Sequence, residues 1–378
     1  MKKNASLLLM ILSASVGAQA WSQVPTNVTA WLKDSMPSIV PSSSCYCGAT
    51  AYPSRDPAAF QGSVTNRNVL ALPEVVGVYF HVVKNDAGNS PGTSIDSVLQ
   101  KFELMRDLYS PHGICFLLAG IGEIHNSDLD TQYYESEESE LAPYLKPDLL
   151  NIFIHDYLAS EPGGSTAGGW AYDIPNTYFS WWELSVIDTN ATSVVAHETG
   201  HCFGLYHTHD SSQGEENVDR SGGCENCATS GDLLCDTQAD PNLATNGYMS
   251  GCSYVGTVTD NCNDPYIPDP SNVMSYSLGS CQTNFSGGQG LRSLSFLYGS
   301  LSNLVVPLNR TLIQNVTYST GEYFHMAEEN VTFSASNLSF TGAAILRSAA
   351  GNSVNVLPGT TFSPGSGFTV LSAQSTCD

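Results

Sequence analysis

Apolar residues gather in a few short runs in the first half of the chain. Residues 75–83 (VVGVYFHVV) are dominated by β-branched and aromatic side chains, which predicts a buried central strand. Residues 114–118 and 149–154 are two further runs that predict buried strands. Residues 168–172 (GGWAY) predict a short, glycine-led edge strand. The four segments together predict a sheet.

Two segments show helical signals instead. Ser94 and Asp96 follow a turn rich in Gly, Asn and Pro, and they open a helix whose apolar residues share one face. Residues 192–204 predict a second helix that ends at Gly204, with apolar residues on one side and charged or imidazole residues on another. Strands and helices of this kind predict an α/β (α+β) fold. The apolar face of the first helix consists of Ile95, Val98, Leu99, Phe102, Met105 and Tyr109.

In the rest of the chain, apolar residues do not recur at the regular spacing of a strand or a helix. Residues 207–269 are rich in Gly, Asp, Asn and Cys, which favours an irregular subdomain held by disulfides and ions. Beyond residue 310, short apolar runs separated by Thr, Ser and Gly predict a small all-β module. No repeat of solenoid length is recognisable. We expect a main domain over residues 69–305 and a β-rich module over residues 306–378.

The N-terminal segment has the parts of a secretory signal. Residues 1–20 begin with two lysines, continue through an apolar run and end in Ala18-Gln19-Ala20, so we expect a cleaved signal peptide and a secreted protein. The apolar run is too short for an anchor, and no transmembrane segment is expected elsewhere. Residues 21–68 are rich in Ser, Pro and Ala, which predicts a prosegment or leader that contains Cys45 and Cys47.

The content of charged residues narrows the range of expected binding partners. The 378 residues include 36 acidic and 13 basic side chains, giving a formal net charge of −23. Such a surface repels nucleic acid and anionic lipid, so neither is an expected partner. Eleven cysteines in an exported chain predict a disulfide framework, and the odd number leaves at least one thiol without an intrachain partner.

One pentapeptide indicates a metal centre. His197-Glu198-Thr199-Gly200-His201 places two imidazoles at positions i and i+4 of the second predicted helix, where they can bind one zinc ion together. Gly204 allows the sharp turn that brings His207 in as a third ligand. Three imidazoles leave the fourth zinc position to water. Glu198 can take a proton from that water, so the predicted reaction is peptide hydrolysis without a covalent intermediate.

Other candidates near this motif have plainer interpretations. Cys202 lies about 100° around the helix from His201, which favours a core or disulfide role. His209 is interpreted as a loop histidine that does not bind the metal. The remaining histidines have no spacing relation to the motif and are interpreted as structural: His81, His112, His125, His155 and His325.

The eleven residues HETGHCFGLYH match the metzincin signature HExxHxxGxxH in full, so the chain resembles this clan of zinc peptidases. Residues 271–276 (SNVMSY) resemble its methionine turn. The resemblance implies that Met274 forms the floor of the zinc site. It also implies that Tyr276 stabilises the charge that develops on the substrate oxygen.

Between these motifs the chain is similar to the pappalysin family. HTH follows the third ligand, and GGC, GDLLCDT and NVMSYS come later in the family's order, although the family's usual HTF and DTPA are changed to HTH and DTQA. The resemblance covers roughly residues 70–300. It implies a mixed sheet with a backing helix and an active-site helix, and a substrate that lies along the edge strand. It also implies two disulfides, Cys224 with Cys262 and Cys252 with Cys281; Cys227 and Cys235 are additional and could pair with each other.

The same resemblance suggests a second metal. Asp232, Asp236 and Thr237 are similar to the calcium-binding segment of the family, and hard oxygen donors on an irregular loop suit Ca²⁺. The alternative is a solvated acidic loop. Family members that cut before basic residues have an acidic residue just before the cysteine that follows the methionine turn. Here that position is Ser280, so the resemblance does not imply an arginine preference, although the negative field of the protein could still favour basic substrates.

The two cysteines of the predicted prosegment have two interpretations, and one of them would keep a precursor of the protein inactive. A thiolate of Cys45 or Cys47 could block the open zinc position in a precursor, whereas a disulfide within the prosegment is the plainer interpretation.

The sequence therefore predicts a secreted zinc endopeptidase that acts on proteins or peptides. The alternatives are a surface adhesion or binding protein with a vestigial zinc site, and a metzincin of another family. The first alternative predicts the loss of a ligand or of the base, and none is lost. The sequence does not predict the physiological substrate or the oligomeric state.

Overall fold

The structure is a computed structural model. It describes residues 74–90, 92–188 and 193–307. It also describes two short N-terminal strands and the strands of the C-terminal part: residues 9–12, 47–49, 309–313, 317–318, 321–327, 330–334, 339–340, 344–350, 353–356, 361–362 and 367–372. Most of the predicted prosegment lies outside these residues.

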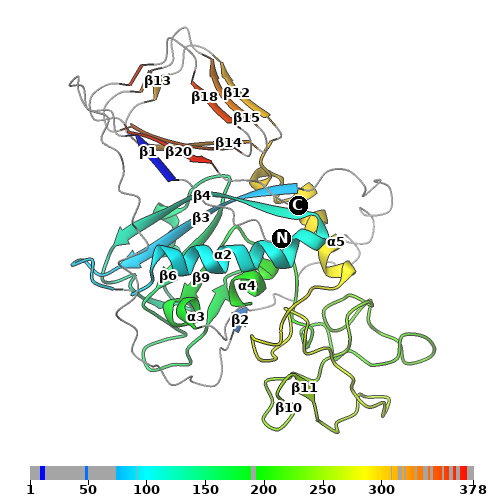
Figure 1. Ribbon diagram of the computed structural model, residues 1–378. Coiled ribbons are helices and arrows are strands. Elements are labelled where there is room, and N and C mark those ends of the chain that lie inside the picture. The colour runs from blue at the N-terminus through cyan, green and yellow to red at the C-terminus, as the bar shows by residue number, and fades with distance from the viewer. Residues whose placement is uncertain are drawn as a thin grey trace, which may run out of the picture.

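A mixed six-stranded sheet forms the centre of the molecule (Figure 1). Four neighbouring strands are parallel, while β8 runs antiparallel to β9 and β2 runs parallel to β8. In spatial order the strands are β2 (Cys47–Ala49), β8 (Gly169–Ala171), β9 (Tyr178–Trp182), β6 (Leu150–His155), β3 (Glu74–Lys84) and β4 (Ile114–His125). The predicted glycine-led strand is β8, but β2 pairs along its outer side.

Burial explains why these segments form central strands. Every residue of β6 is buried, and so are all residues of β3 except its two ends. A strand that is covered on both faces needs continuous apolar residues, which is the pattern of the sequence at 75–83 and 149–154. Strand β9 was not predicted, because its five residues YFSWW lie between segments without a clear period.

Two helices cover one face of this sheet (Figure 1). Helix α2 (Ile95–Tyr109) follows Ser94, whose side chain accepts a hydrogen bond from Ser97 N. It buries most of the predicted apolar face, but Ile95 is 62% exposed. Helix α4 (Val194–Cys202) is buried along its whole length. The two helices are joined where the Tyr109 hydroxyl donates to the Ala196 carbonyl at 2.9 Å. This contact fixes α4 against α2.

Smaller elements complete the main part. They are α3 (Glu183–Ile187), α5 (Gly287–Tyr298), the 3-10 turns Ser110–His112, Glu138–Tyr144 and Ser302–Leu304, the pair β5 (Thr131–Tyr133) and β7 (Tyr157–Ala159), and the pair β10 (Met249–Ser250) and β11 (Ser253–Tyr254). Between α4 and α5 the chain is mostly irregular, as its composition predicted. Among the described residues no helix is long and apolar enough to cross a membrane.

All described elements beyond residue 308 are strands, in three parallel stacks. Asn309 pairs with Asn330, 21 residues later, and Asn330 pairs with Ser353, 23 residues later. Such spacing is that of stacked coils, so the expectation that no repeat of solenoid length exists was wrong. The stacks are β12 (Asn309–Ile313), β15 (Asn330–Ser334) and β18 (Ser353–Val356); β13 (Thr317–Tyr318), β16 (Ser339–Phe340) and β19 (Thr361–Phe362); and β14 (Gly321–Ala327), β17 (Ala344–Ala350) and β20 (Gly367–Ser372).

One stack packs on the face of the central sheet opposite the helices (Figure 1). Met326 and Phe324 of β14 contact an apolar cluster that includes Val75 and Tyr79 of β3. The rings of Tyr79 and Phe324 meet edge to face with centroids 5.5 Å apart. At the other side of this stack, β1 (Leu9–Leu12) pairs antiparallel with β20. The predicted removal of residues 1–20 and the predicted domain limits stay predictions.

Candidate metal centre

Three histidine side chains meet where α4 ends. The Nε2 atoms of His197 and His201 are 3.1 Å apart, those of His201 and His207 are 3.0 Å apart, and those of His207 and His197 are 3.1 Å apart. Nitrogens that bind one tetrahedral zinc ion at about 2.0–2.1 Å are about 3.3 Å from each other. In the described part of the chain, this is the group of side chains close enough to share a metal ion. The three residues therefore fit zinc.

The second nitrogen of two of these rings is fixed by the backbone. His197 Nδ1 lies 2.6 Å from the Val273 carbonyl oxygen, and His201 Nδ1 lies 2.8 Å from the Leu205 carbonyl oxygen. Because a carbonyl can only accept, Nδ1 is assigned the proton, which leaves the lone pair of Nε2 directed at the metal position.

Burial keeps the three imidazoles neutral. Desolvation lowers the pKa of His197 to about 4, and it lowers the pKa values of His201 and His207 well below the usual range. Neighbouring imidazoles lower the pKa values of His201 and His207 further. A neutral imidazole is the form that binds a metal, so the site is ready for zinc at neutral pH.

The turn after the helix depends on Gly204. Its φ of +88° is a conformation that residues with a Cβ rarely adopt. A Cβ built on Gly204 would also lie 2.1 Å from Cε2 of Phe296 in α5. The glycine therefore serves both the backbone conformation and the close packing against α5 that return the chain toward His207.

Met274 is fully buried. A Cβ on Gly200 would meet its sulfur at 2.6 Å, so the methionine packs directly against α4. The turn is held by Asn272, whose Oδ1 accepts from Met274 N at 2.9 Å, and by the Met274 carbonyl, which accepts from Thr208 N at 3.1 Å. The predicted floor residue is thus in contact with the active-site helix.

Glu198 is fully buried against β8. Its Oε2 accepts a hydrogen bond of 2.9 Å from Ala171 N, and a Cβ on Gly169 would lie only 2.5 Å from its Cγ. The sequence indicated the carboxylate but not these two contacts, because nothing in a local pattern shows which glycine will face it.

An aromatic cluster borders the three histidines. The ring of Tyr276 lies 4.6 Å from that of His207 and 4.2 Å from that of His209. His209 also stacks on His207, with centroids 4.9 Å apart and planes inclined by 15°. His209 therefore contacts both a predicted zinc ligand and the predicted charge-stabilising tyrosine. It is not among the three histidines that converge, in agreement with its interpretation as a residue that does not bind the metal, but the sequence did not indicate these ring contacts.

Two of the three predicted calcium ligands lie side by side, and the third points toward another element. Asp236 turns toward α5, where its carboxylate accepts from Ser286 Oγ at 3.1 Å and from Gly288 N at 2.5 Å. Asp232 instead accepts from Thr237 Oγ1 at 3.0 Å. Asp232 Oδ2 is buried without a hydrogen-bond partner, and the calcium site implied from Asp232, Asp236 and Thr237 stays a prediction.

Disulfides tie the irregular segment together. Cys224 is bonded to Cys262 and Cys252 to Cys281, the pairs that the resemblance implied. The additional cysteines, Cys227 and Cys235, are bonded to each other. Cys202 is buried as a free thiol, with Sγ 3.5 Å from the Tyr178 carbonyl oxygen. Cys115 is also disulfide-bonded.

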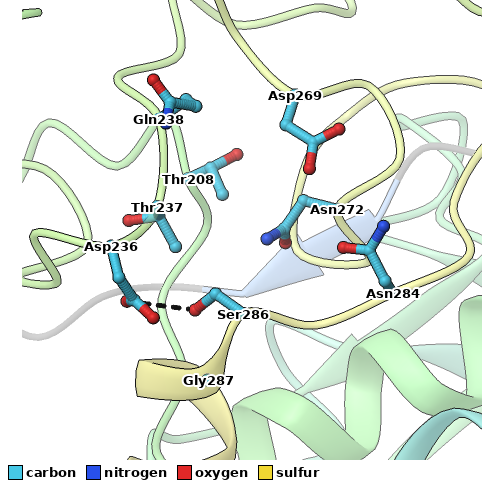
Figure 2. Close-up of a pocket in the computed structure, with 9 residues that line it drawn as sticks. All are labelled: Thr208, Asp236, Thr237, Gln238, Asp269, Asn272, Asn284, Ser286 and Gly287. Atoms are coloured by element: carbon cyan, nitrogen blue, oxygen red, sulfur yellow. Dashed lines mark hydrogen bonds between the residues drawn. The ribbon is translucent and has the colours of Figure 1, made fainter.

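A polar pocket of about 310 Å³ adjoins the methionine turn (Figure 2). Thr208, the neighbour of His207, lines it together with the carboxylates of Asp236 and Asp269. Ser280, the position considered for specificity, is exposed and does not line this pocket. Figure 2 shows Asp236 directed at Ser286 and Asp269 directed toward the centre of the pocket. The other lining residues are Thr237, Gln238, Asn272, Asn284, Ser286 and Gly287.

A mixed sheet with three converging histidines, two on α4 and one shortly after it, fits a metallopeptidase. A model of metallopeptidase family M12 (Reprolysin_5) matches residues 84–246. An extracellular metalloprotease of Podospora anserina is 30% identical over 248 residues, which are 62% of this chain and 77% of that protein. The chain belongs to the metallopeptidase family of these extracellular metalloproteases.

Two further proteins are similar to this chain. An extracellular metalloprotease of Sordaria macrospora is 30% identical over 241 residues, covering 58% of this chain and 74% of that protein. Among solved structures, a promirolysin mutant of Tannerella forsythia is similar with a TM-score of 0.49 and 17% identity, covering 65% of this chain and 89% of that chain.

Proposed function

We propose that this protein is a secreted zinc endopeptidase that hydrolyses peptide bonds in proteins. The observation that supports this most directly is the convergence of the His197, His201 and His207 Nε2 atoms within 3.0–3.1 Å of one another, with Glu198 on the same helix. When bound, a zinc ion supplies Lewis-acid polarisation of the scissile carbonyl and makes water more acidic.

Glu198 is the proposed general base. Its carboxylate is held at β8 by Ala171 N, so its position is fixed before substrate arrives. It would accept a proton from the attacking water and later deliver that proton to the leaving amine. Tyr276, beside the ring of His207, is the proposed donor that stabilises negative charge on the substrate oxygen. Met274 supports the histidines from below.

We propose that the substrate lies along β8 as an added strand. In the full chain β2 pairs with this strand, with Cys47 opposite Gly169 and Ala49 opposite Ala171. A leader strand at this edge would exclude a substrate strand, which supports the proposal that residues 21–68 keep the precursor inactive. The thiol switch and the prosegment disulfide remain the two alternatives for Cys45 and Cys47. Replacing both with Ala should give an active precursor if the thiol blocks zinc, whereas a silent precursor would favour the steric block alone.

Export is proposed from three observations. The relatives are named extracellular, the chain begins with a signal-like segment, and three disulfides join described residues.

We further propose that residues 1–20 are removed, that residues 69–305 form the catalytic domain and that residues 306–378 form a β-rich module. The order of the motifs HTH, GGC, GDLLCDT and NVMSYS supports a pappalysin-like subclass. The net charge of −23 argues against a nucleic-acid partner.

The test is proteolysis of a mixed-sequence protein such as casein by the processed protein, beside its Glu198→Ala variant and a zinc-depleted sample. Cleavage is expected from the zinc-loaded parent alone, and the new termini will give the residue preference. If the parent with one equivalent of zinc leaves casein and a random peptide library intact, the endopeptidase proposal is wrong and the binding-protein alternative is favoured.

A further inference from the structure

The third histidine is held differently from the other two. The Nδ1 atoms of His197 and His201 each meet a backbone carbonyl oxygen, that of Val273 and that of Leu205. Among the described residues, none hydrogen-bonds to Nδ1 of His207, whose Nε2 faces those of the other two rings. The position of His207 therefore depends on the rings beside it and on the backbone that follows it.

Thr208, the next residue, is held at two points. Its backbone N donates to the Met274 carbonyl oxygen at 3.1 Å, and its hydroxyl donates to Asp240 Oδ2 at 2.7 Å. Thr208 is 4% exposed and Asp240 is 8% exposed, so leaving either group without its partner would be costly. The first contact joins the segment of the third ligand to the methionine turn, and the second joins it to a carboxylate 32 positions further along the chain.

The same carboxylate also serves the methionine turn. Burial raises the pKa of Asp240 to about 6, against hydrogen bonds from Thr208 and Ser275 that lower it. The group is therefore ionised at neutral pH, and its oxygens can only accept. Its Oδ1 accepts from Asn242 N at 2.8 Å. Ser275 is fully buried and is the residue before Tyr276, so Asp240 serves both the residue after the third ligand and the residue before the tyrosine.

Further buried contacts tie the methionine turn to the start of α4. Gln282 Nε2 donates to the Ser275 carbonyl oxygen, and Gln282 Oε1 accepts from Ser193 Oγ. The Ser193 carbonyl oxygen accepts from His197 N at 2.8 Å, in the first turn of the helix. Gln282 is 8% exposed and Ser193 is fully buried. Polar contacts thus run from the helix to the third ligand through Ser193, Gln282, Ser275, Asp240 and Thr208.

We propose that Asp240 is a positioning residue that holds the third zinc ligand and the charge-stabilising tyrosine in a fixed relation to each other. The proposal rests on the proposed function, which gives His207 and Tyr276 their roles. The two rings lie 4.6 Å apart, and each belongs to a residue next to one that Asp240 contacts. Loss of the carboxylate therefore releases both rings at once. Asp240 acts through these neighbours and does not itself contact the reacting atoms.

The first experiment measures zinc affinity, which needs no substrate. The full processed chain carries Glu198→Ala to prevent self-digestion, and zinc is titrated against a chromogenic chelator. Adding Asp240→Ala should weaken zinc binding about tenfold, since partners behind metal ligands typically contribute 10–100-fold. Asp264→Ala, at an exposed aspartate of the same irregular segment, is the matched control and should bind zinc as the parent does.

Equal zinc affinities in the Asp240→Ala and Asp264→Ala variants would overturn the proposal. A parent that binds no zinc would contradict the proposed function itself, and this proposal with it. A parent that binds zinc but cleaves no protein would contradict the endopeptidase proposal alone, because the affinity comparison still tests Asp240.

The second experiment separates positioning from folding. Cobalt(II) is placed in the site of the same Glu198→Ala chain, because its visible absorption depends on the geometry of its ligands. Asp240→Ala should shift these bands. Met326→Ala is the control, since it removes a side chain buried against the central sheet, away from the three histidines, and should leave the bands unchanged. Unchanged bands in Asp240→Ala would make Asp240 a folding residue only and overturn the proposal.

The third experiment follows the path through Thr208 in the active enzyme. Asp240→Ala should lower kcat about 10²-fold with little change in KM, the effect of misplacing a catalytic group by about 1 Å. Thr208→Val removes the hydroxyl and should lower kcat as well, whereas Thr208→Ser keeps the hydroxyl and should restore most of it. A Thr208→Ser enzyme as slow as Thr208→Val would overturn the proposal. Should Asp240→Ala fail to fold, the two Thr208 variants decide, by kcat and by zinc affinity.

Discussion

The Glu198 carboxylate accepts a hydrogen bond of 2.9 Å from the backbone N–H of Ala171. This bond joins the active-site helix to the strand along which the substrate is proposed to lie. The proposed base and the proposed substrate edge are therefore one structural unit. A change in β8 that moves the carboxylate should alter the chemistry without altering the metal ligands.

Gly169 offers such a change. A Cβ at this position would lie 2.5 Å from Glu198 Cγ and 2.8 Å from its Oε1, so Gly169→Ala must displace the carboxylate. The expected result is a fall in kcat of about 10²-fold, the effect of misplacing a catalytic group by about 1 Å. Zinc content, measured by mass spectrometry of the metal, should stay at the parent's value.

Gly223→Ala is the matched control for this variant. A Cβ on Gly223 meets nothing within 4 Å, so its activity should equal that of the parent. If Gly169→Ala keeps full kcat, Glu198 does not act from the position that it has here, and the assignment of the base must be revised.

The ring of His209 predicts a second effect on catalysis. It lies 4.2 Å from Tyr276 and stacks on His207, so it limits how the tyrosine can move. His209→Ala should lower kcat about tenfold with little change in KM, because Tyr276 loses its fixed position. His209→Phe keeps an aromatic ring and should restore most of kcat. A His209→Phe enzyme as slow as His209→Ala would show that stacking is not the reason.

The sequence predicts elements that depend on local signals better than contacts between residues far apart in the chain. The helix from Ser94 to Tyr109 and the strand at 75–83 were predictable because capping and apolar spacing are local signals. The metal motif was predictable for the same reason, since His197 and His201 are one helical turn apart. These are the parts of the site that the sequence describes well.

The rest depends on contacts between residues far apart in the chain. Arg220 reaches Thr237 within a segment that has no period, and no pattern indicates which oxygen it will meet. The C-terminal coils were missed because strands of two to seven residues stack through backbone hydrogen bonds, which need no repeated side chain. The resemblance suggested residues for calcium, but it could not show that Asp236 turns to α5.

His155 predicts a pH dependence of stability. It is fully buried between the Leu129 carbonyl oxygen at 2.7 Å and Ser180 Oγ at 2.9 Å, and burial lowers its pKa from 6.5 to about 4. The unfolded chain binds this proton below about pH 6.5, but the folded chain binds it only below about pH 4. Stability is therefore lost as the pH falls through this window, by at most about 1.4 kcal/mol per pH unit.

The measurement is the melting temperature at pH 7 and pH 5 for the parent and for His155→Gln. The variant should be less stable at pH 7, because it loses the imidazole's hydrogen bonds, but it should lose less on acidification. His125→Gln is the comparison at an accessible position, since the His125 side chain is 50% exposed. An unchanged pH dependence in His155→Gln would contradict the prediction.

Met326 predicts that the C-terminal strands contribute to the stability of the central sheet. Its side chain is 7% exposed and packs so closely on β3 that a Cβ on Gly77 would meet its Cε at 2.2 Å. Met326→Ala should destabilise the protein by about 2–4 kcal/mol, through lost apolar burial and a cavity beside Val75 and Tyr79.

Met249→Ala, at a partly exposed position in β10, is the matched control. Chemical denaturation of both variants checks this. Equal stabilities would mean that the strands after residue 308 fold independently of the sheet, whereas a single cooperative transition shifted only in Met326→Ala would mean that the sheet and these strands unfold together.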